Sequence, residues 1–252
     1  MKKILSILIT TAFSLVLQPA FAQLGGPPTG PKFDGALAKV FGDNSAFTAT
    51  LESQIKPKSG DTITMPGKMS FDSGKSRIEM DLASATGLRL PPGAAEQMKA
   101  MGLDQITTLT LPEKKALYLI YPGLKSYVEN PLPDAGSTTN DDYKVTKTEM
   151  GKETVDGHPS VENKVVVTDA KGVAKEFTVW NATDMKDFPV KIVHAEKSNE
   201  ITMTFKNVQL AKPAASTFEL PADYTRYESM QAMMQAEMMK KMGGGMGMPM
   251  GK

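Results

Sequence analysis

Short β-strands separated by turn residues fill most of this chain and constrain its fold more than any other feature. From residue 46 onward, short runs rich in β-branched and aromatic side chains alternate with segments rich in Gly, Pro, Asn and Asp. The last run, 200–208, has a period of two, so Ile201, Met203 and Phe205 face one way and their neighbours the other. About ten such strands with few helices predict a mainly β protein with a large antiparallel sheet or barrel.

Composition and turn residues place the individual strands. We expect strands at 47–51, 68–71, 76–82, 106–111, 116–121, 126–129, 143–150, 161–168, 173–180, 190–194 and 200–208. The segment 72–75 (DSGK) has the composition of a hairpin turn. The runs 117–121 and 165–167 are apolar on both faces, which predicts strands buried on both sides by a ligand, a lid or protein alone.

Three segments have helical patterns instead. Apolar residues in 33–41 recur at helical spacing, and Gly42 ends this predicted N-terminal helix. The segment 94–101 (AAEQMKAM) follows a Pro-Pro pair and precedes a glycine, which predicts a second, short helix. Methionines at helical spacing predict a Met-rich helix over 227–242, followed by a disordered Gly/Met tail over 243–252.

The first 22 residues have the pattern of a secretory signal peptide. A basic start is followed by an apolar run over 4–17 and by Ala20-Phe21-Ala22, the small-x-small pattern of a cleavage site. The run is short for a membrane span, so we expect a soluble periplasmic or secreted product without an integral membrane anchor. The next segment, 23–31 (QLGGPPTGP), is predicted to be a flexible linker.

Charge and cysteine content exclude further classes of protein. The chain has 29 basic and 28 acidic residues and no cysteine. A near-neutral chain has no electrostatic basis for nucleic-acid binding, so no nucleic-acid partner is expected. Without disulfides, burial of apolar surface must hold the fold together. The sequence leaves the oligomeric state open.

Motifs of the common enzyme classes are missing from the sequence. The chain has no G-x-S-x-G or H-E-x-x-H motif, and Gly74-Lys75-Ser76 lacks the first glycine of a phosphate loop because Met69 stands there. Its two histidines, His158 in an expected turn and His194 on an expected strand, fit structural roles better than catalytic ones. The sequence therefore predicts a protein that is not an enzyme and that needs no cofactor.

The methionines of the C-terminus leave one metal hypothesis open. Met246, Met248 and Met250 stand at alternate positions, and thioethers are soft ligands suited to Cu(I). Methionine is also an adaptable packing residue, and packing is favoured for the stripe within 230–242. Copper(I) binding is therefore an alternative for the tail rather than for the helix.

Several motifs together resemble a known superfamily. They are YPGLKSY at 121–127, GKETVDGH at 151–158, Val179-Trp180, FPVKI at 188–192 and FELPADY at 218–224. The chain resembles the LolA/LolB-like superfamily of periplasmic lipoprotein carriers over residues 32–226, and it looks most like a secreted branch with a Met-rich C-terminus. The resemblance implies an unclosed, strongly curved antiparallel sheet, or half-barrel, with an N-terminal helix and a short helical lid over the concave face.

The resemblance also implies a candidate ligand site. Met98 and Met101 would belong to the lid, and Leu117, Leu119 and Trp180 would line the cavity beneath it. The expected function is that of a soluble periplasmic protein that binds an apolar ligand, either a lipid or an acylated protein. The alternatives are copper(I) handling by the Met tail and an envelope interaction protein that holds no ligand.

Overall fold

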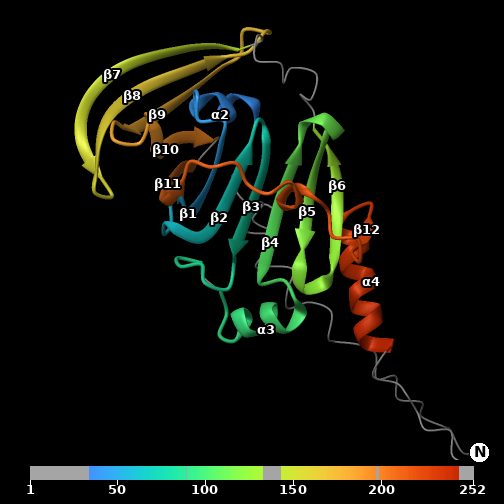
Figure 1. The fold of residues 1–252 in the computed structure, drawn as a ribbon. Coiled ribbons are helices and arrows are strands. Elements are labelled where there is room, and N and C mark those ends of the chain that lie inside the picture. The colour runs from blue at the N-terminus through green and yellow to red at the C-terminus, as the bar shows by residue number, and fades with distance from the viewer. Residues whose placement is uncertain (1–33, 89, 133–142, 197–198, 244–252) are drawn as a thin grey trace, which may run out of the picture. The chain divides into compact units, whose positions relative to one another are not determined.

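The described part of the chain is built around one large sheet. The computed structural model describes residues 34–88, 90–132, 143–196 and 199–243. These belong to a single compact unit, residues 31–252. Twelve strands form one sheet in the order β12-β6-β5-β4-β3-β2-β1-β11-β10-β9-β8-β7 (Figure 1). All neighbours are antiparallel except β12 and β6, which are parallel.

The strands follow one another along the chain with few interruptions. They are β1 (Ala46–Pro57), β2 (Ile63–Asp72), β3 (Lys75–Asp81), β4 (Gln105–Leu111), β5 (Ala116–Tyr121), β6 (Ser126–Pro131), β7 (Lys144–Val155), β8 (His158–Thr168), β9 (Ala174–Ala182), β10 (Phe188–Glu196), β11 (Asn199–Gln209) and β12 (Thr225–Tyr227).

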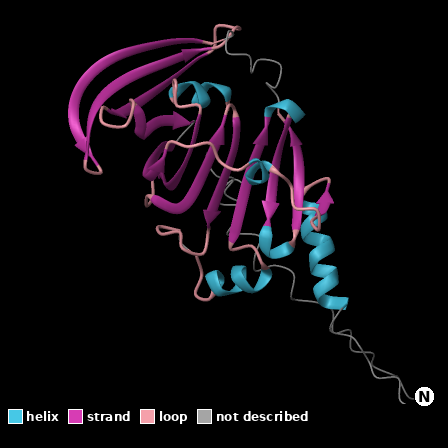
Figure 2. Ribbon diagram, viewed as in Figure 1, coloured by secondary structure: helices cyan, strands magenta, loops and turns pink. Residues whose placement is uncertain are grey.

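Helices are few and short, as Figure 2 shows. The α-helices are α2 (Gly35–Val40), α3 (Ala94–Met101) and α4 (Met230–Gly243), and the 3₁₀ turns are η1 (Pro112–Lys114), η2 (Pro122–Leu124) and η4 (Ala215–Phe218). Among the described residues, no helix has the length and hydrophobicity of a membrane span.

The sheet is curved and does not close. Strands β7 and β12 are its two edges and do not pair with each other. Figure 1 shows β7, β8 and β9 arching away from the remaining strands. The predicted fold class, a mainly β half-barrel with few helices, is therefore confirmed.

Strand register divides the side chains into two faces. We call the face that carries Leu51, Met203 and Val179 the inner face, because α2 packs against it through Phe41. Aromatic rings fill this contact: the Phe41 ring lies 4.8 Å from that of Phe47 and 5.5 Å from that of Phe205. Ring pairs at these separations are attractive beyond the area that they bury. The core thus anchors the N-terminal helix to the inner face.

Strands β4 and β5 are also covered on the outer face. Tyr118 and Ile120 point outward and pack in a buried cluster with Leu109 and Phe218. Phe218 belongs to η4, in the segment that runs from β11 across the outer face (Figure 1). The sequence predicted burial of β5 on both faces, and here protein rather than ligand covers the outer one.

Several strands are longer than expected, and two further differences concern a turn and a short strand. The β7–β8 turn consists of Asp156 and Gly157, which have φ angles of 50° and 86°, so His158 begins β8 instead of lying in the turn. Positive φ at both central positions is the geometry that favours Asp-Gly in a two-residue hairpin. Strand β12 was not predicted, because its three residues are too few for a pattern.

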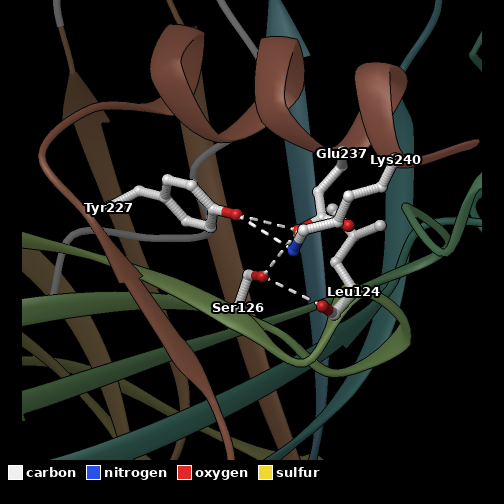
Figure 3. A network of polar contacts seen from close by, with 5 residues as sticks. All are labelled: Leu124, Ser126, Tyr227, Glu237 and Lys240. Atoms are coloured by element: carbon white, nitrogen blue, oxygen red, sulfur yellow. Dashed lines mark hydrogen bonds and ion pairs between the residues drawn. The ribbon is translucent and has the colours of Figure 1, made fainter. Parts of the chain in front are cut away.

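The C-terminal helix α4 is attached to the β12 edge by one buried methionine and a polar network. Met233 is fully buried, whereas Met239 is 73% exposed. The Glu237 carboxylate accepts hydrogen bonds from Tyr227 at 3.0 Å, Lys240 at 2.6 Å and Ser126 at 3.4 Å (Figure 3). The Ser126 hydroxyl also contacts the carbonyl oxygen of Leu124 at 2.9 Å. These contacts tie the Met-rich helix to β6 and β12.

The Glu237 carboxylate has an altered titration because of this network. The Lys240 hydrogen bond lowers the pKa of Glu237, partial burial acts in the opposite direction, and the Tyr227 and Ser126 hydroxyls lower it further. The network is therefore strongest when Glu237 is ionised. The predicted signal peptide (1–22), linker (23–31) and last nine residues of the tail lie outside the described residues.

Candidate functional site: a groove on the inner face

A groove of about 930 Å³ opens between α2 and the strands β7, β8 and β9. Five of its lining residues belong to the inner face of the sheet. They are Phe71, Thr110, Val145, Val167 and Lys175. The groove is completed by the first turn of α2, by the β2–β3 and β4–β5 turns, and by Leu132 and Tyr143. Its volume lies within the range of small-molecule sites, roughly 300–1,000 Å³.

One wall of the groove is held in place by a charged pair. Asp34 is the N-cap of α2, and its Oδ1 accepts a hydrogen bond from the Leu37 amide at 3.0 Å. Its Oδ2 accepts a hydrogen bond from the Lys175 ammonium on β9. Burial lowers the pKa of Lys175, but the hydrogen bond and charge of Asp34 outweigh it, so the pKa is raised overall. The pair joins the helix to a strand that lies 141 residues further along the chain.

A close contact with Tyr143 constrains the same turn of α2. A Cβ atom at Gly35 would lie 2.5 Å from the Tyr143 hydroxyl oxygen, so only glycine fits there without a shift of the ring. The Lys39 ammonium lies 5.8 Å from the centre of the same ring. Tyr143 therefore packs along α2 and forms part of the groove wall.

The turn between β8 and β9 supplies further polar groups. The Asp169 carboxylate accepts hydrogen bonds from the amides of Lys171 at 2.9 Å and Val173 at 2.8 Å. Val173 is 57% exposed and Val145 is 46% exposed, so both present apolar surface to the groove. The groove thus combines exposed valines with lysine and aspartate side chains at its rim.

The predicted site residues are not gathered in this groove. Met98 is buried and Met101 half-buried on α3, whose C-terminal Gly102 approaches Gly123 of η2 so closely that a Cβ would lie 2.6 Å from its carbonyl oxygen. Figure 1 shows α3 at the far end of the strands from α2. The short helix therefore lies beside the β5–β6 turn.

Two predicted cavity residues share a strand and a face, and the third does not. Leu117 and Leu119 lie on the inner face of β5, opposite Thr110 and Thr108. Trp180 lies on β9, which six strands separate from β5. Its neighbour Val179 is on the inner face, so Trp180 points outward.

On the outer face, Trp180 is paired with a lysine. The Lys191 ammonium lies 4.0 Å from the centre of the Trp180 ring, a cation–π contact. Trp180 is only 7% exposed. The tryptophan thus packs in the outer surface of β9 and β10, away from the groove.

Met246, Met248 and Met250 lie outside the described residues. Within the described ranges, no group of three or more His, Cys, Asp or Glu side chains is arranged to hold a metal ion. His158 Nδ1 lies 2.9 Å from Asp184 Oδ2 at the protein surface. Burial lowers the pKa of His194, which packs against the Phe177 ring.

Sequence reasoning missed the groove residues because nothing local distinguishes them. Asp34 was recognisable as a helix cap before an apolar stripe, but its partner Lys175 is one of many lysines. Tyr143 and Val145 read only as the start of a strand. The glycine at the start of α2, Gly35, was the one local signal of a close approach.

Comparison with protein families gives one match. The model of a domain of unknown function, DUF4412, matches residues 174–224. This span contains β9, β10, β11 and η4, and it is less than half of the chain. No curated protein matches the chain.

Solved structures similar to this chain include one LolA superfamily protein. A LolA superfamily protein from Nitrosomonas europaea is 9% identical with a TM-score of 0.41, and the match covers 82% of this chain and 98% of that one. LprF from Mycobacterium bovis is 12% identical with a TM-score of 0.39, and the match covers 75% of this chain and 95% of that one. The lipoprotein LppX from Mycobacterium tuberculosis is 10% identical with a TM-score of 0.39, and the match covers 77% of this chain and 96% of that one.

Proposed function

We propose that this chain is a soluble binding protein of the periplasm or the exterior, which holds an apolar ligand such as a lipid or an acylated protein. The observation that supports it most is the groove of about 930 Å³ with inner-face residues along its floor. Its exposed valines offer apolar surface to a chain, and its charged rim can face a polar end group. We propose no catalytic role.

The energetics of such a ligand do not require a charged contact. Each methylene group that leaves water contributes about 0.8 kcal/mol, so a long acyl chain is retained by burial alone. Asp34 and Lys175, the charged pair in the groove wall, already neutralise each other. The groove therefore suits a ligand whose affinity comes mainly from its chain.

Native mass spectrometry of the protein from periplasmic expression tests the proposal directly. We expect a co-purifying mass that corresponds to a lipid or an acylated peptide. A bound copper ion that disappears when the tail is removed would instead favour the metal-handling alternative. A bare protein that also fails to take up a fluorescent fatty acid would favour the interaction protein without a ligand.

Substitutions of residues that line the groove test whether the ligand binds there. Val145→Glu and Val173→Glu introduce charge at exposed positions of the groove wall, so both should weaken fatty-acid uptake without unfolding the protein. Met150→Glu is the matched control, because Met150 is a 60% exposed apolar residue on the same strand as Val145 but does not line the groove. Equal uptake by all three variants would contradict binding in the groove.

A further inference from the structure

A second concave site lies on the outer face of the sheet. It is a pocket of about 360 Å³ over β1, β2, β3 and β11, and Thr217 of η4 completes its wall. Thr50, Lys68 and Glu79 form one row across its floor, because Lys68 is opposite Thr50 on one side and Glu79 on the other. Leu51 is on the inner face, so this row points outward. The pocket shares no lining residue with the groove, so the two sites are distinct.

A β-bulge shapes one side of this pocket. Thr48 is opposite Gln209, but Thr50 is opposite Lys206, so β11 has one more residue than β1 at this point. Asn207 lies in the bulge with a φ of 51°, a left-handed conformation that asparagine tolerates better than most residues. Its Nδ2 lies 3.5 Å from Thr50 Oγ1. The bulge therefore directs an amide group toward the outward-facing row.

The cationic side chains of this pocket have donors to spare. Arg77 lies on β3, two residues before Glu79, and its Nε donates a hydrogen bond to Glu79 Oε1 at 2.8 Å. Among the described residues, this carboxylate is the only side-chain partner of Arg77, and the Lys68 ammonium has none. Two cations and one carboxylate leave the lining with an excess of one positive charge.

These groups can be reached from solvent. Thr50, Lys68 and Asn207 are exposed, and the Arg77 side chain is 21% exposed. Ser70, directly opposite Arg77, is half-buried and also lines the pocket. A ligand that enters the pocket therefore meets charged, hydroxyl and amide groups at accessible positions.

This lining fits an oxyanion. A guanidinium has five N–H donors in a planar fork, so the terminal nitrogens of Arg77 can bind phosphate oxygens while Nε stays on Glu79. Lys68 adds a second positive charge on the neighbouring strand, within reach of a long side chain on the same face. Hydrogen bonds between ionised partners are about twice as strong as neutral ones. The hydroxyl and amide groups can bind the hydroxyls of an attached polyol.

We infer that the outer-face pocket binds a phosphate ester of a small polyol, with Arg77 and Lys68 on the phosphate and Asn207 on the polyol. The inference goes beyond the proposed function, because it concerns another face and another class of ligand. The phosphate ester can be a free molecule or the head group of a phospholipid, since both present the same chemistry to the pocket.

Isothermal titration calorimetry with sn-glycerol 3-phosphate at low ionic strength tests the inference. We expect saturable binding to the unaltered protein, and about tenfold weaker binding by Arg77→Gln and by Lys68→Gln. Lys206→Gln is the matched control, because Lys206 is also on the outer face, pairs with Glu52 at 3.7 Å and does not line the pocket. An equal loss of affinity in Lys206→Gln would overturn the inference.

Asn207→Gly gives a test that leaves the backbone undisturbed. Glycine adopts the same left-handed conformation without strain, so this variant should fold as the unaltered protein does and lose only the amide group. We expect glycerol 3-phosphate to bind a few-fold more weakly. Unchanged affinity in a folded Asn207→Gly variant would contradict the role given to Asn207.

Vesicle sedimentation distinguishes the two sources of the phosphate. If the ligand is a head group, phosphatidylglycerol vesicles should bind the unaltered protein more than Arg77→Gln, and glycerol 3-phosphate should compete. If it is a free molecule, glycerol 3-phosphate should bind and the vesicles should not. Binding of neither probe would overturn the inference. Fatty-acid uptake by Arg77→Gln should be unchanged, so this test and that of the groove can fail independently.

Discussion

The two edge strands of the sheet, β12 and β7, are protected against pairing with another chain in different ways. An uncovered edge strand presents unpaired amide and carbonyl groups to which another chain can add. At one edge, β12 has only three residues, and α4 packs beside it and β6. At the other edge, β7 has twelve residues, and all of them except Gly151 and Val155 are exposed. One edge is short and has a helix beside it, and the other is long and open.

The open edge is protected by its sequence. Lys144, Lys147 and Lys152 place positive charges along β7. The register with β8 shifts between Glu149 and Gly151, which leaves Met150 as an extra residue in a β-bulge. Charges and a bulge both hinder the addition of another strand. Val145 of β7 forms part of the groove wall, so among the described residues the long, exposed edge is the one beside the groove.

The largest expected effect on stability is at the helix-covered edge. Met233→Ala removes a fully buried side chain between α4 and the sheet, so we expect the free energy of unfolding to fall by roughly 2–4 kcal/mol. Denaturant unfolding measures it. Met239→Ala on the same helix is the control and should change little, since that side chain is 73% exposed. Equal effects of the two substitutions would mean that α4 is not attached through Met233.

The polar network of α4 should give a smaller, pH-dependent effect. Glu237→Gln removes the carboxylate that binds Lys240, Tyr227 and Ser126, and should cost about 1 kcal/mol at neutral pH because the Lys240 end is open to solvent. The pKa of Glu237 is lowered in the folded protein, so its contribution is present above the ordinary glutamate value of 4.5 and is lost as pH falls through the folded pKa.

Denaturant unfolding curves measured at several acidic pH values test this expected pH dependence. The difference between the unaltered protein and Glu237→Gln should shrink as the pH falls below the ordinary glutamate value. Glu228→Gln, at an exposed position just before α4, serves as the control. A difference that grows on acidification would show that Glu237 does not stabilise the helix as a carboxylate.

At the open edge we expect a change in association rather than stability. The double variant Lys147→Val and Lys152→Val removes two charges from β7, so it should self-associate with rising concentration while its free energy of unfolding changes by about 0.5 kcal/mol or less. Sedimentation velocity measures the association. Lys164→Val on β8 is the control, because strands flank β8 on both sides. A monomeric double variant would show that the bulge and the remaining Lys144 are enough to protect the edge.

The smallest effect is expected beyond α4. Truncation before Gly243 should leave the melting midpoint nearly unchanged, because the removed residues have few aromatic or β-branched side chains to bury. Calorimetry of the full and shortened chains measures it. A fall of several degrees in the melting midpoint would show that the tail packs on the sheet and contributes to its stability, as α4 does.

Much of the fold could be predicted from local sequence patterns. The hairpin turn at 72–75 and the alternation of β11 fixed which side chains share a face. The helix α2 followed from its apolar spacing and the glycine after it. Such features depend on residues within one turn or one strand, so they can be recognised in the sequence without knowledge of the rest of the chain.

The candidate site depended on relations that no local pattern contains. Trp180 was expected to line a cavity, and strand register places it on the outer face next to Lys191. Strand β12 was missed because its three residues gain their structure only from parallel pairing with β6. Short segments have too few residues for periodicity to exceed chance.

By itself, the sequence determined the β class, the positions of most strands along the chain and the places where helices interrupt them, because backbone propensity and side-chain alternation act over a few residues. Tertiary structure alone decided that Asp34 meets Lys175 and that Tyr143 packs against Gly35. The curvature of the sheet and the pairing of distant strands set these contacts. They depend on the whole arrangement of strands, and the groove exists only where that arrangement brings them together.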